Sequence, residues 1–458
     1  MHDALFEHVA ALLERHCNSG ARLTVGLSGG LDSVVLLSLL HRLRNRFDFQ
    51  LAAHHVNHQI SPNAQSWASF CENLCAALAV PFSQTIVNVP RDTGKGLEAA
   101  ARALRHEAFL TLDVDFILLG HHQDDQAETL LLRLLRGAGV KGLAAMAECS
   151  PIGNRTRVAS APRILRPLLH QPRSSLASFA HAEGLQWIDD ESNTDIHYTR
   201  NYLRVELLPR INVRFPTYRS ILDRAATQFA EAEQLLAVLA AIDAKDAIND
   251  GRITVQALTA LDEPRAKNLL RYFLAQHHLK MPDHARLHEI LRQISTVRHN
   301  AEVCIAHDGI ELRVFRDWLY VVHSHSSPSS DFQLQWQGEL HWRIPALHGA
   351  MVFEETPGCG IAKDALVGNN EVSVRLRQGG ETLRLGENRP RQTLKNLLQT
   401  AGIPPWERER LPLLYIGDEL AYVPGIGVDV AFKATTSGKG ITLAWMSENT
   451  GHFSAPVR

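Results

Sequence analysis

Six consecutive residues near the start of the chain have the types that can bind a phosphate. The segment Ser28-Gly29-Gly30-Leu31-Asp32-Ser33 lies between an apolar run, Leu23 to Leu27, and a stretch with helical apolar spacing, Val34 to Leu43. Glycines let backbone N–H groups face an anion at close range, and the positive end of the following helix dipole favours the same charge. The two serines can donate hydroxyl hydrogen bonds, and Asp32 could hold Mg²⁺. A strand-to-helix turn capped by Asp or Ser explains these residues equally well at this point.

A second polar segment, Gly120 to Thr129 (GHHQDDQAET), follows another apolar run, Phe116 to Leu119. Asp124 and Asp125 precede Glu128 by four and three positions, a spacing that puts carboxylates on one face of a helix. Such a cluster suits a cation, although the acidic start of a solvated helix has the same composition. Because the carboxyl ends of neighbouring parallel strands meet at one edge of a sheet, the two polar segments could share a site for Mg²⁺ and ATP.

Strand-like runs alternate with helical segments over residues 1–215. This alternation predicts an α/β fold with a doubly wound parallel sheet covered on both faces. Thr217 to Ser295 then has helical apolar spacing throughout, whereas Ala301 to His323 has strand character with a hairpin turn at Asp308-Gly309.

Ser324 to Ser330 (SHSSPSS) has the composition of a linker. Short β-like runs with glycine turns follow it, interrupted by a predicted helix at Gln392 to Thr400. We therefore predict three domains: a nucleotide-binding catalytic domain over 1–215, a mainly helical substrate domain over 216–326, and a small α+β domain over 327–458.

Composition excludes several other classes of protein. The 458 residues are 45% hydrophobic and 21% charged, as in globular proteins, and the six Cys form no C-x-x-C pair and no zinc-ligand spacing. Three histidines, His54, His55 and His58, end a strand-like run, but they alternate faces and lack partner carboxylates, which disfavours a metal site. The start of the chain resembles no secretory signal, and no apolar run has the length of a membrane helix. The sequence thus predicts a cytoplasmic protein without a membrane partner.

The first segment matches the S-G-G-x-D-S signature of the pyrophosphatase-loop (PP-loop) family, which converts ATP to AMP and pyrophosphate. The second, Gly120 to Met146, resembles the H-x-x-D-D-x-x-E-T…R-G-x-G signature of one branch, the tRNA(Ile)-lysidine synthetases. Further segments are similar to that family in the same order along the chain: Ala101 to Arg105, Arg166 to Leu169, Trp187 to Asn193, Arg200 to Arg204, Arg375 to Glu381 and Pro404 to Arg408. The resemblance spans nearly the whole chain and is weakest over roughly 297–370.

The resemblance implies an ATP-dependent ligase that modifies the wobble cytidine of tRNA(Ile) with a CAU anticodon. ATP would adenylate the C2 oxygen of the base, and the ε-amine of L-lysine would then displace AMP to give lysidine, which changes the codon read to AUA and the tRNA identity from Met to Ile. It implies Asp32, Glu128, Arg200 and Arg204 as catalytic residues, and Asp32 with Asp125 as ligands for Mg²⁺. The residues implied for ATP binding are Ser28, Gly29, Gly30, Leu31, Asp32 and Ser33. Spacing alone leaves Arg200 and Arg204 open as a solvated helix face.

Charge is distributed unevenly along the chain, although the net charge is only −2. Residues 1–130 carry a net charge of −5, residues 131–220 carry +6, and residues 374–395 carry +4. Two basic zones beside an acidic half suit a large polyanion such as tRNA. From these zones we predict tRNA contacts by Arg133, Arg166, Arg375, Arg377, Arg389, Arg391 and Lys395.

Two alternative functions remain. A PP-loop tRNA thiolase would need reactive or cluster-binding cysteines near the loop, but Cys71 and Cys75 lie outside the signature segments. A nucleotide-binding module without catalytic activity would not need the carboxylate cluster and the pair Arg200 and Arg204. Both alternatives are therefore weaker than the ligase.

Overall fold

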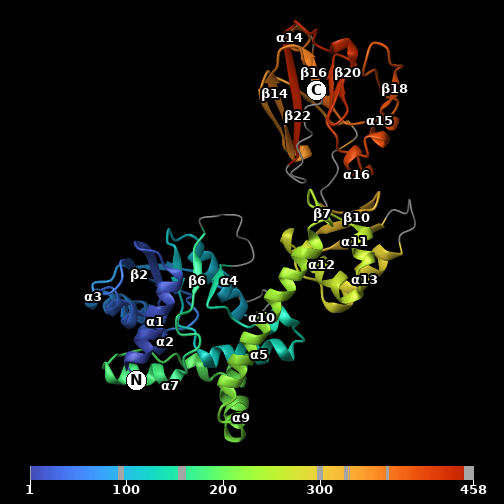
Figure 1. The fold of residues 1–458 in the computed structure, drawn as a ribbon. Helices are drawn as coiled ribbons and strands as arrows, with labels where there is room; N and C mark the ends of the chain where they lie inside the picture. The colour runs from blue at the N-terminus through green and yellow to red at the C-terminus, as the bar shows by residue number, and fades with distance from the viewer. Residues whose placement is uncertain are drawn as a thin grey trace. The chain divides into compact units, whose positions relative to one another are not determined.

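The computed structural model describes residues 2–90, 97–152, 161–296, 303–323, 329, 331–367 and 371–447. It divides into two compact units, Met1–Leu239 and Ala240–Arg458, which are described separately below (Figure 1). The predicted linker Ser324 to Ser330 falls outside the described residues except for Ser329. Among the described residues, no helix combines the length and the apolar character needed to cross a bilayer.

The first unit is built on a six-stranded sheet with the order β3-β2-β1-β4-β6-β5. All neighbours are parallel except β5, which runs antiparallel to β6. The order reverses direction between β1 and β4, so the predicted doubly wound α/β fold is confirmed, and this reversal is where such folds bind ligands. The strands are β1 (Ala21–Gly26), β2 (Phe49–Asn57), β3 (Phe82–Ile86), β4 (Phe116–Leu118), β5 (Cys149–Pro151) and β6 (Arg163–Leu165).

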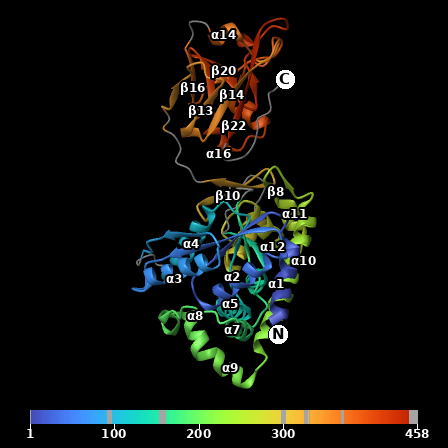
Figure 2. The same ribbon diagram turned by 90° about the vertical axis from the view of Figure 1, so that its left-hand side faces the viewer.

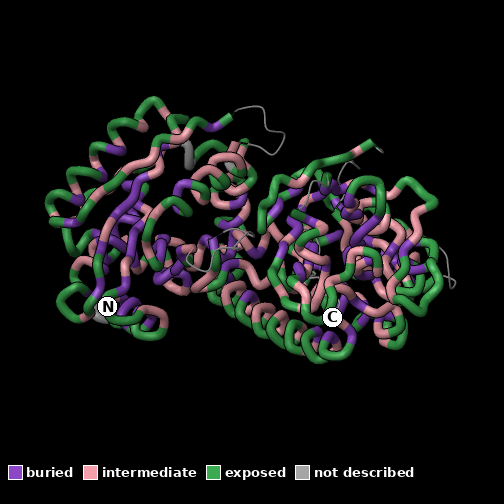
Figure 3. Tube along the Cα trace, turned by 90° about the horizontal axis from the view of Figure 1, so that it is seen from above, coloured by how far each residue is buried: buried purple, intermediate pink, exposed green. Residues whose placement is uncertain are grey.

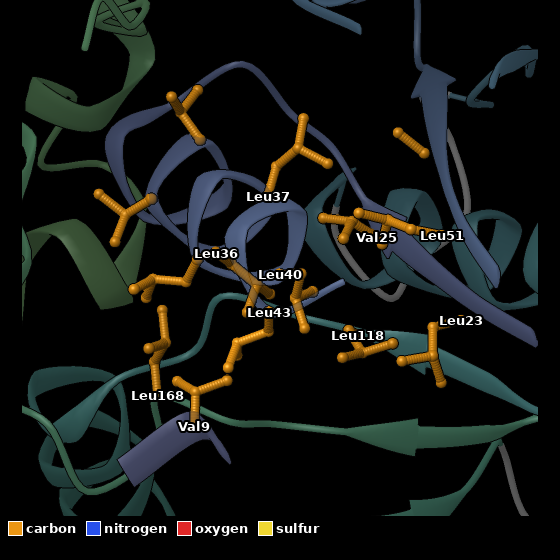
Figure 4. Packing of buried hydrophobic residues seen from close by; sticks show 14 of the residues in the cluster. Val9, Leu23, Val25, Leu36, Leu37, Leu40, Leu43, Leu51, Leu118 and Leu168 are labelled. Carbon is orange, nitrogen blue, oxygen red and sulfur yellow. The ribbon is translucent and has the colours of Figure 1, made fainter. Parts of the chain in front are cut away.

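Helices cover both faces of this sheet. On one face, Leu40 and Leu43 of α2 belong to one apolar cluster with Leu23, Val25 and Leu118 of the strands (Figure 4). On the other face, Phe109 of α4 packs against Ile117 of β4. Leu118 follows Ile117 in the strand, and its side chain points to the α2 face because strand residues alternate faces. The helices are α1 (His2–His16), α2 (Leu31–Leu43), α3 (Ala64–Ala77), α4 (Leu97–Leu110), α5 (Gln123–Leu135), α6 (Val140–Leu143) and α7 (Arg173–Ala182).

An irregular helical segment ends the first unit. It consists of η1 (Glu191–Thr194), α8 (Thr199–Tyr202), a π-helical turn η2 (Leu203–Leu207), α9 (Leu208–Arg214) and the long helix α10 (Tyr218–Ala244), which is labelled in Figure 2. The π turn is marked by the Leu208 N–H, which donates to the Leu203 carbonyl five residues earlier. Such insertions change which side chains share a helix face and often occur at functional sites.

The first turns of α10 are fixed to the rest of the unit by polar contacts. His170 Nδ1 lies 3.0 Å from both carboxylate oxygens of Asp223. Gln123 Nε2 donates to the same carboxylate at 3.4 Å, and Tyr218 is buried beside Ala127 of α5. The α10 helix therefore begins in contact with the amino-terminal half of α5.

We expect Asp223→Asn to destabilise the protein more at pH 5.5 than at pH 9. The hydrogen bond to Asp223 is the largest cause that raises the pKa of His170. A raised pKa stabilises the fold below the ordinary histidine pKa, and this contribution is lost as pH rises through the raised value. The free energy of unfolding should fall by about 1 kcal/mol more at the lower pH, a Tm difference of about 2–4 °C. Thermal melts at both pH values measure this, with exposed Glu231→Gln on α10 as the control. Equal losses at both pH values would contradict the assignment.

The second unit begins with helices that pack on one small sheet of order β7-β8-β11-β10-β9. Its elements are β7 (Ile248–Asn249), β8 (Arg252–Thr254), α11 (Val255–Ala260), α12 (Glu263–Gln276), α13 (His284–Ser295), β9 (Val303–His307), β10 (Ile310–Phe315) and β11 (Trp318–His323). The predicted hairpin at Asp308-Gly309 is confirmed, with φ of 49° and 78°. The prediction of helix throughout Thr217 to Ser295 was wrong at β7 and β8, whose turn Asp250-Gly251 has φ of 49° and 70°.

The rest of the second unit contains two antiparallel sheets whose inner faces share one core, including Met351 and Trp445 from one sheet and Val374 and Leu414 from the other. One sheet contains β12 (Gln333–Gln335), β16 (Val372–Arg375), β19 (Leu413–Ile416), β20 (Glu419–Val423) and β21 (Gly427–Val428). The other contains β13 (His341–Ile344), β14 (Gly349–Glu355), β15 (Ile361–Ala362) and β22 (Gly440–Ser447). Shorter elements are η3 (Pro345–Leu347), α14 (Lys363–Val367), β17 (Thr382–Leu383), β18 (Gln392–Thr393), α15 (Leu394–Thr400), α16 (Pro405–Arg408) and η4 (Val430–Phe432).

The helix predicted at Gln392 to Thr400 is present but begins two residues later, at Leu394, because the preceding residues pair as β18 and Thr393 caps the helix. Buried residues follow the strands in both units, and exposed residues lie on the outer faces of the helices (Figure 3). The boundaries 1–215, 216–326 and 327–458 stay a prediction.

Candidate active site

The glycine-rich loop connects β1 to α2 with its backbone held open toward the sheet edge. Gly29 has φ of 88°, in the left-handed region that favours glycine. Gly30 is the N-cap of α2 and makes no side-chain capping bond. The two serines bond within the loop instead, with Oγ atoms of Ser28 and Ser33 3.1 Å apart. The strand-to-helix turn capped by an Asp or Ser side chain, which the sequence left open, therefore does not form.

Close backbone contact brings the two polar segments together. A Cβ atom on Gly120, directly after β4, would lie 2.8 Å from the backbone carbonyl of Asp32. Only glycine allows this approach, because no side-chain rotation can relieve a clash with backbone. The predicted meeting of the Ser28–Ser33 loop with the start of α5 is thus confirmed.

Two carboxylates of α5 meet two arginines from the irregular helical segment. Arg200 Nε donates to Glu128 Oε2 at 2.7 Å, and Arg204 Nε donates to Glu128 Oε1 at 2.7 Å. Arg200 also reaches Asp125 Oδ1 at 2.8 Å, and Arg204 reaches the same oxygen at 3.3 Å. Glu128 is only 1% exposed. Arg200 and Arg204 are therefore not a solvated helix face, and the four residues form one ionic cluster around the buried carboxylates of Asp125 and Glu128.

Electrostatics fix the protonation of this cluster. Burial opposes ionisation of Asp125, but the charges of His122 and Arg200 outweigh it and lower its pKa to about 2. Burial also opposes a charge on His122, yet Asp32 and Asp125 raise its pKa above the usual value. His122 Nε2 lies 3.5 Å from an oxygen of each of these aspartates. Asp125 therefore stays ionised near neutral pH and has no proton to donate there.

Asp124 points elsewhere, although the sequence grouped it with Glu128 on one helix face. Its Oδ1 accepts a hydrogen bond from Arg219 Nε, and its Oδ2 accepts one from the backbone N–H of Arg173 at 3.2 Å. Asp124 thus joins α5 to α10 and α7, whereas its neighbour Asp125 belongs to the ionic cluster.

Two cavities flank the glycine-rich loop. The smaller, about 350 Å³, is lined by the loop and by the ends of β1 and β2, including His55 and Val56. The larger, about 490 Å³, is lined by Asp125, Arg200 and Arg204 and by the α4 side. Both cavities are bounded by Gly26, Ser28, Asp32, His58, Arg105, Leu119, Asp190 and Arg204.

Sequence reasoning missed several residues that line these cavities: Arg102, Arg105, His121, Arg173, Tyr198 and Asn201. Arg102 and Arg105 lie in the A-R-x-x-R segment, so their position in a family-like segment was a usable signal. His121 lies in the family-like segment Gly120 to Met146 and had the same signal, whereas Arg173 had none, because a cavity wall is a property of the folded chain. Burial lowers the pKa of His121 to about 3, so its imidazole is neutral.

His54, His55, Cys71 and Cys75 behave as structural groups. His54 bonds to Ser83 Oγ and His55 to the Leu27 carbonyl, each at 2.8 Å. Over the part of the chain that the structure describes, no cluster of His, Cys, Asp or Glu has the arrangement of a metal site. Burial raises the pKa of Cys71 to about 12 and that of Cys75 to about 11. Such thiols stay protonated, which disfavours sulfur transfer.

The predicted tRNA-binding residues fall into two groups. Arg133 donates to the carbonyls of Gly142 and Ala145, and Arg166, which is 6% exposed, donates to the carbonyl of Ala147. The buried guanidinium of Arg166 thus serves the interior of the first unit, contrary to the expectation that it faces a polyanion. Arg133 is half-buried, and its contact with tRNA stays a prediction. In the second unit, Arg389 and Lys395 are exposed. Arg375 contacts Asp418, Arg377 contacts Glu381, and Arg391 contacts Asp429.

The family models and the relatives that match this chain agree on one family. A PP-loop domain model matches residues 3–211, a TilS substrate binding domain model matches 254–320, and a TilS substrate C-terminal domain model matches 372–445. A tRNA(Ile)-lysidine synthase of Nitrosomonas europaea is 41% identical over 94% of this chain and 93% of its own length. One from Aromatoleum aromaticum is 42% identical over 93% of this chain and 97% of its own length. Among solved structures, a U34-tRNA thiolase of Methanococcus maripaludis gives a TM-score of 0.42 at 17% identity, over 50% of this chain and 79% of that one.

Proposed function

This chain belongs to the tRNA(Ile)-lysidine synthase family, and on that premise we propose that it joins L-lysine to C2 of the wobble cytidine of tRNA(Ile) with a CAU anticodon. ATP activates the base by adenylation, and the products are lysidine, AMP and pyrophosphate. The PP-loop domain supports ATP as the activating substrate.

The observation that carries this proposal is the wall shared by the two cavities at Ser28 and Asp32. The smaller cavity contains the loop backbone and suits ATP, with its phosphates on the loop and the start of α2. The larger cavity contains arginines and carboxylates and suits the base and the lysine. The α-phosphate of ATP and the C2 oxygen would then meet beside Asp32.

In the first step, the C2 oxygen attacks the α-phosphorus, an O–P bond forms, and pyrophosphate leaves with the electron pair of the broken P–O bond. The donor set at Asp32 fits a Mg²⁺ ion bound mainly through phosphates, because its buried Oδ1 has no hydrogen-bond partner. When bound, Mg²⁺ neutralises charge on the phosphates. Arg200 and Arg204, held by Glu128, supply fixed positive charge beside the activated base.

In the second step, the lysine amine attacks C2 and AMP leaves with the electron pair of the C–O bond. The carboxylates of Asp32, Asp125 and Asp190 line the larger cavity and would attract the ammonium group before it loses its proton. Glu128 lies behind the two arginines, with both oxygens bonded to them. We therefore propose that Glu128 orients the arginines rather than binding lysine directly.

Incorporation of labelled lysine into tRNA tests the proposed function. The purified chain with ATP, Mg²⁺ and tRNA(Ile) bearing CAU should incorporate one lysine for each AMP released. The same tRNA with uridine at the wobble position is the control, and it should gain none, because a carbonyl replaces the amino group at C4. AMP release without lysine incorporation would overturn the proposal.

We propose that the exposed basic residues of the second unit bind the tRNA backbone, and we expect reversal of two of them to weaken tRNA binding. Arg389→Glu with Lys395→Glu should raise the Kd for tRNA by about 10-fold or more at 0.15 M salt and reduce the salt slope by about 2, because each cation releases about one counterion. Both side chains are exposed, so the fold should be retained. Arg391 is avoided because a glutamate there would face the buried Asp429.

Filter binding at several salt concentrations measures this effect, and the ATP KM at saturating tRNA should be unchanged. Glu419→Lys, which adds a cation at an exposed position of the same unit, is the matched control for a general change in charge. An unchanged Kd and salt slope in the double variant would exclude this surface from tRNA binding.

A further inference from the structure

Arg173, the first residue of α7, reaches the nucleotide side of the site. Its guanidinium Nε lies 3.9 Å from Asp32 Oδ1. The residue lines the smaller cavity together with Ser28, Gly30 and Leu31 of the glycine-rich loop. Its side chain remains 54% exposed, so the loose ion pair leaves most of its donors available to a ligand. Neither the sequence signatures nor the domain matches single out this residue.

Asp124 holds Arg173 at this place. Its Oδ2 accepts a hydrogen bond from the backbone N–H of Arg173 at 3.2 Å, and its Oδ1 accepts one from Arg219 Nε of α10. Arg219 is itself held in place, because its Nη1 atom donates a hydrogen bond to Asn212 Oδ1 at 3.0 Å. A chain of contacts therefore runs from α10 through α5 to the start of α7 and ends at the glycine-rich loop.

A cation at this position has a defined use in the reaction. When the α–β phosphate bond breaks, negative charge develops on the leaving pyrophosphate. Arginine presents several N–H donors in a plane and suits phosphate better than a point charge does. The described wall of the smaller cavity contains three arginines, Arg105, Arg173 and Arg204, and of these Arg105 and Arg204 also line the larger cavity.

We propose that Arg173 binds the β- and γ-phosphates of ATP and the leaving pyrophosphate, and that Asp124 and Arg219 are positioning residues that hold it there. The inference rests on the proposed function, since it takes ATP as the occupant of the smaller cavity. It adds a phosphate ligand outside the Ser28–Ser33 loop. It also gives the adjacent residues Asp124 and Asp125 different tasks.

Arg173→Ala should raise the ATP KM by roughly 10- to 100-fold, the range expected for a lost hydrogen bond to a charged group. Inhibition by added pyrophosphate should weaken by a similar factor, whereas inhibition by AMP and the KM for tRNA should stay within about 2-fold. Arg173→Lys should recover part of the affinity because it keeps the charge. An unchanged ATP KM and pyrophosphate inhibition in Arg173→Ala would overturn the proposal. If the wild-type protein formed no lysidine, the proposed function itself would be overturned.

The positioning role predicts non-additive effects. Asp124→Ala alone should raise the ATP KM by several-fold, but adding it to Arg173→Ala should change the KM by less than about 2-fold, because the residue it positions is already gone. Asp124→Asn keeps an acceptor for the Arg173 N–H and should lie between the wild type and Asp124→Ala. Arg219→Lys is a milder change at the other end of the Asp124–Arg219 contact, because it keeps the positive charge.

The control is Arg42→Ala, which removes an ion pair of 2.7 Å with Glu183 between the far ends of α2 and α7. This variant loosens the same two helices without touching the site, so its ATP KM should stay within about 2-fold. If the increases in ATP KM caused by Asp124→Ala and Arg173→Ala multiply fully in the double variant, Asp124 does not act through Arg173, and the positioning role is wrong.

Discussion

Asp32→Asn is expected to abolish tRNA-dependent release of pyrophosphate, by at least about 1,000-fold, while tRNA binding changes by no more than a few-fold. The substitution keeps the shape of the side chain, removes its charge and replaces one acceptor oxygen by an NH₂ donor. Asp32 stands where the two cavities share a wall, and one of its oxygens is buried without a hydrogen-bond partner. Loss of charge stabilisation at a reacting phosphate costs several kcal/mol, which corresponds to this change in rate.

Pyrophosphate release and filter binding on the same preparation measure the two quantities. Asp113→Asn is the matched control, because Asp113 precedes β4 at the opposite end of the strand and its side chain is 93% exposed. That control should keep full activity. A parallel loss of activity and tRNA binding in Asp32→Asn would mean that the residue supports the fold instead of the chemistry.

The fold of the first unit was accessible from sequence because its strands and helices have strong periodic patterns. Residues 1–215 alternate apolar runs with helical segments, and the sheet follows that pattern. The hairpin β7–β8 was not found, although Asp250-Gly251 carries the same turn signal as Asp308-Gly309. Its strands have two and three residues, too few to interrupt the helical spacing around them.

The candidate active site contains contacts that the sequence pattern could not predict. The sequence placed Asp124, Asp125 and Glu128 together as like charges on a helix. Their different tasks depend on partners far along the chain: Arg219 for Asp124, and Arg200 with Arg204 for the other two. The π-helical turn that follows α8 has no sequence rule of its own. Burial decides a similar question for Arg166, which the sequence assigned to tRNA but whose guanidinium donates to the backbone carbonyl of Ala147.

Glu128→Ala should lower both stability and activity, because it removes the shared partner of two arginines. Glu128 is 1% exposed and accepts hydrogen bonds from Arg200 and Arg204 on both oxygens. Removing one partner of a buried ion pair costs about 3–5 kcal/mol. Arg204 is 39% exposed and can turn toward water, whereas Arg200 is 21% exposed and is more strongly confined. We therefore expect a loss near 3 kcal/mol, a fall in Tm of about 6–12 °C.

Activity should report the orientation of the arginines independently of stability. At a temperature where Glu128→Gln remains folded, lysidine formation should fall by about 100-fold. The neutral amide has one acceptor oxygen in place of two, and its NH₂ group cannot hold a guanidinium, so the arginines lose their fixed positions. The ATP KM should change little, since Glu128 does not line the smaller cavity. Arg204→Ala should cost less stability than Arg200→Ala and a comparable amount of activity, because both arginines face the larger cavity but differ in burial. If the lysine KM alone rises in Glu128→Gln, with kcat retained, Glu128 binds the amine directly and the arginines reorganise on lysine binding.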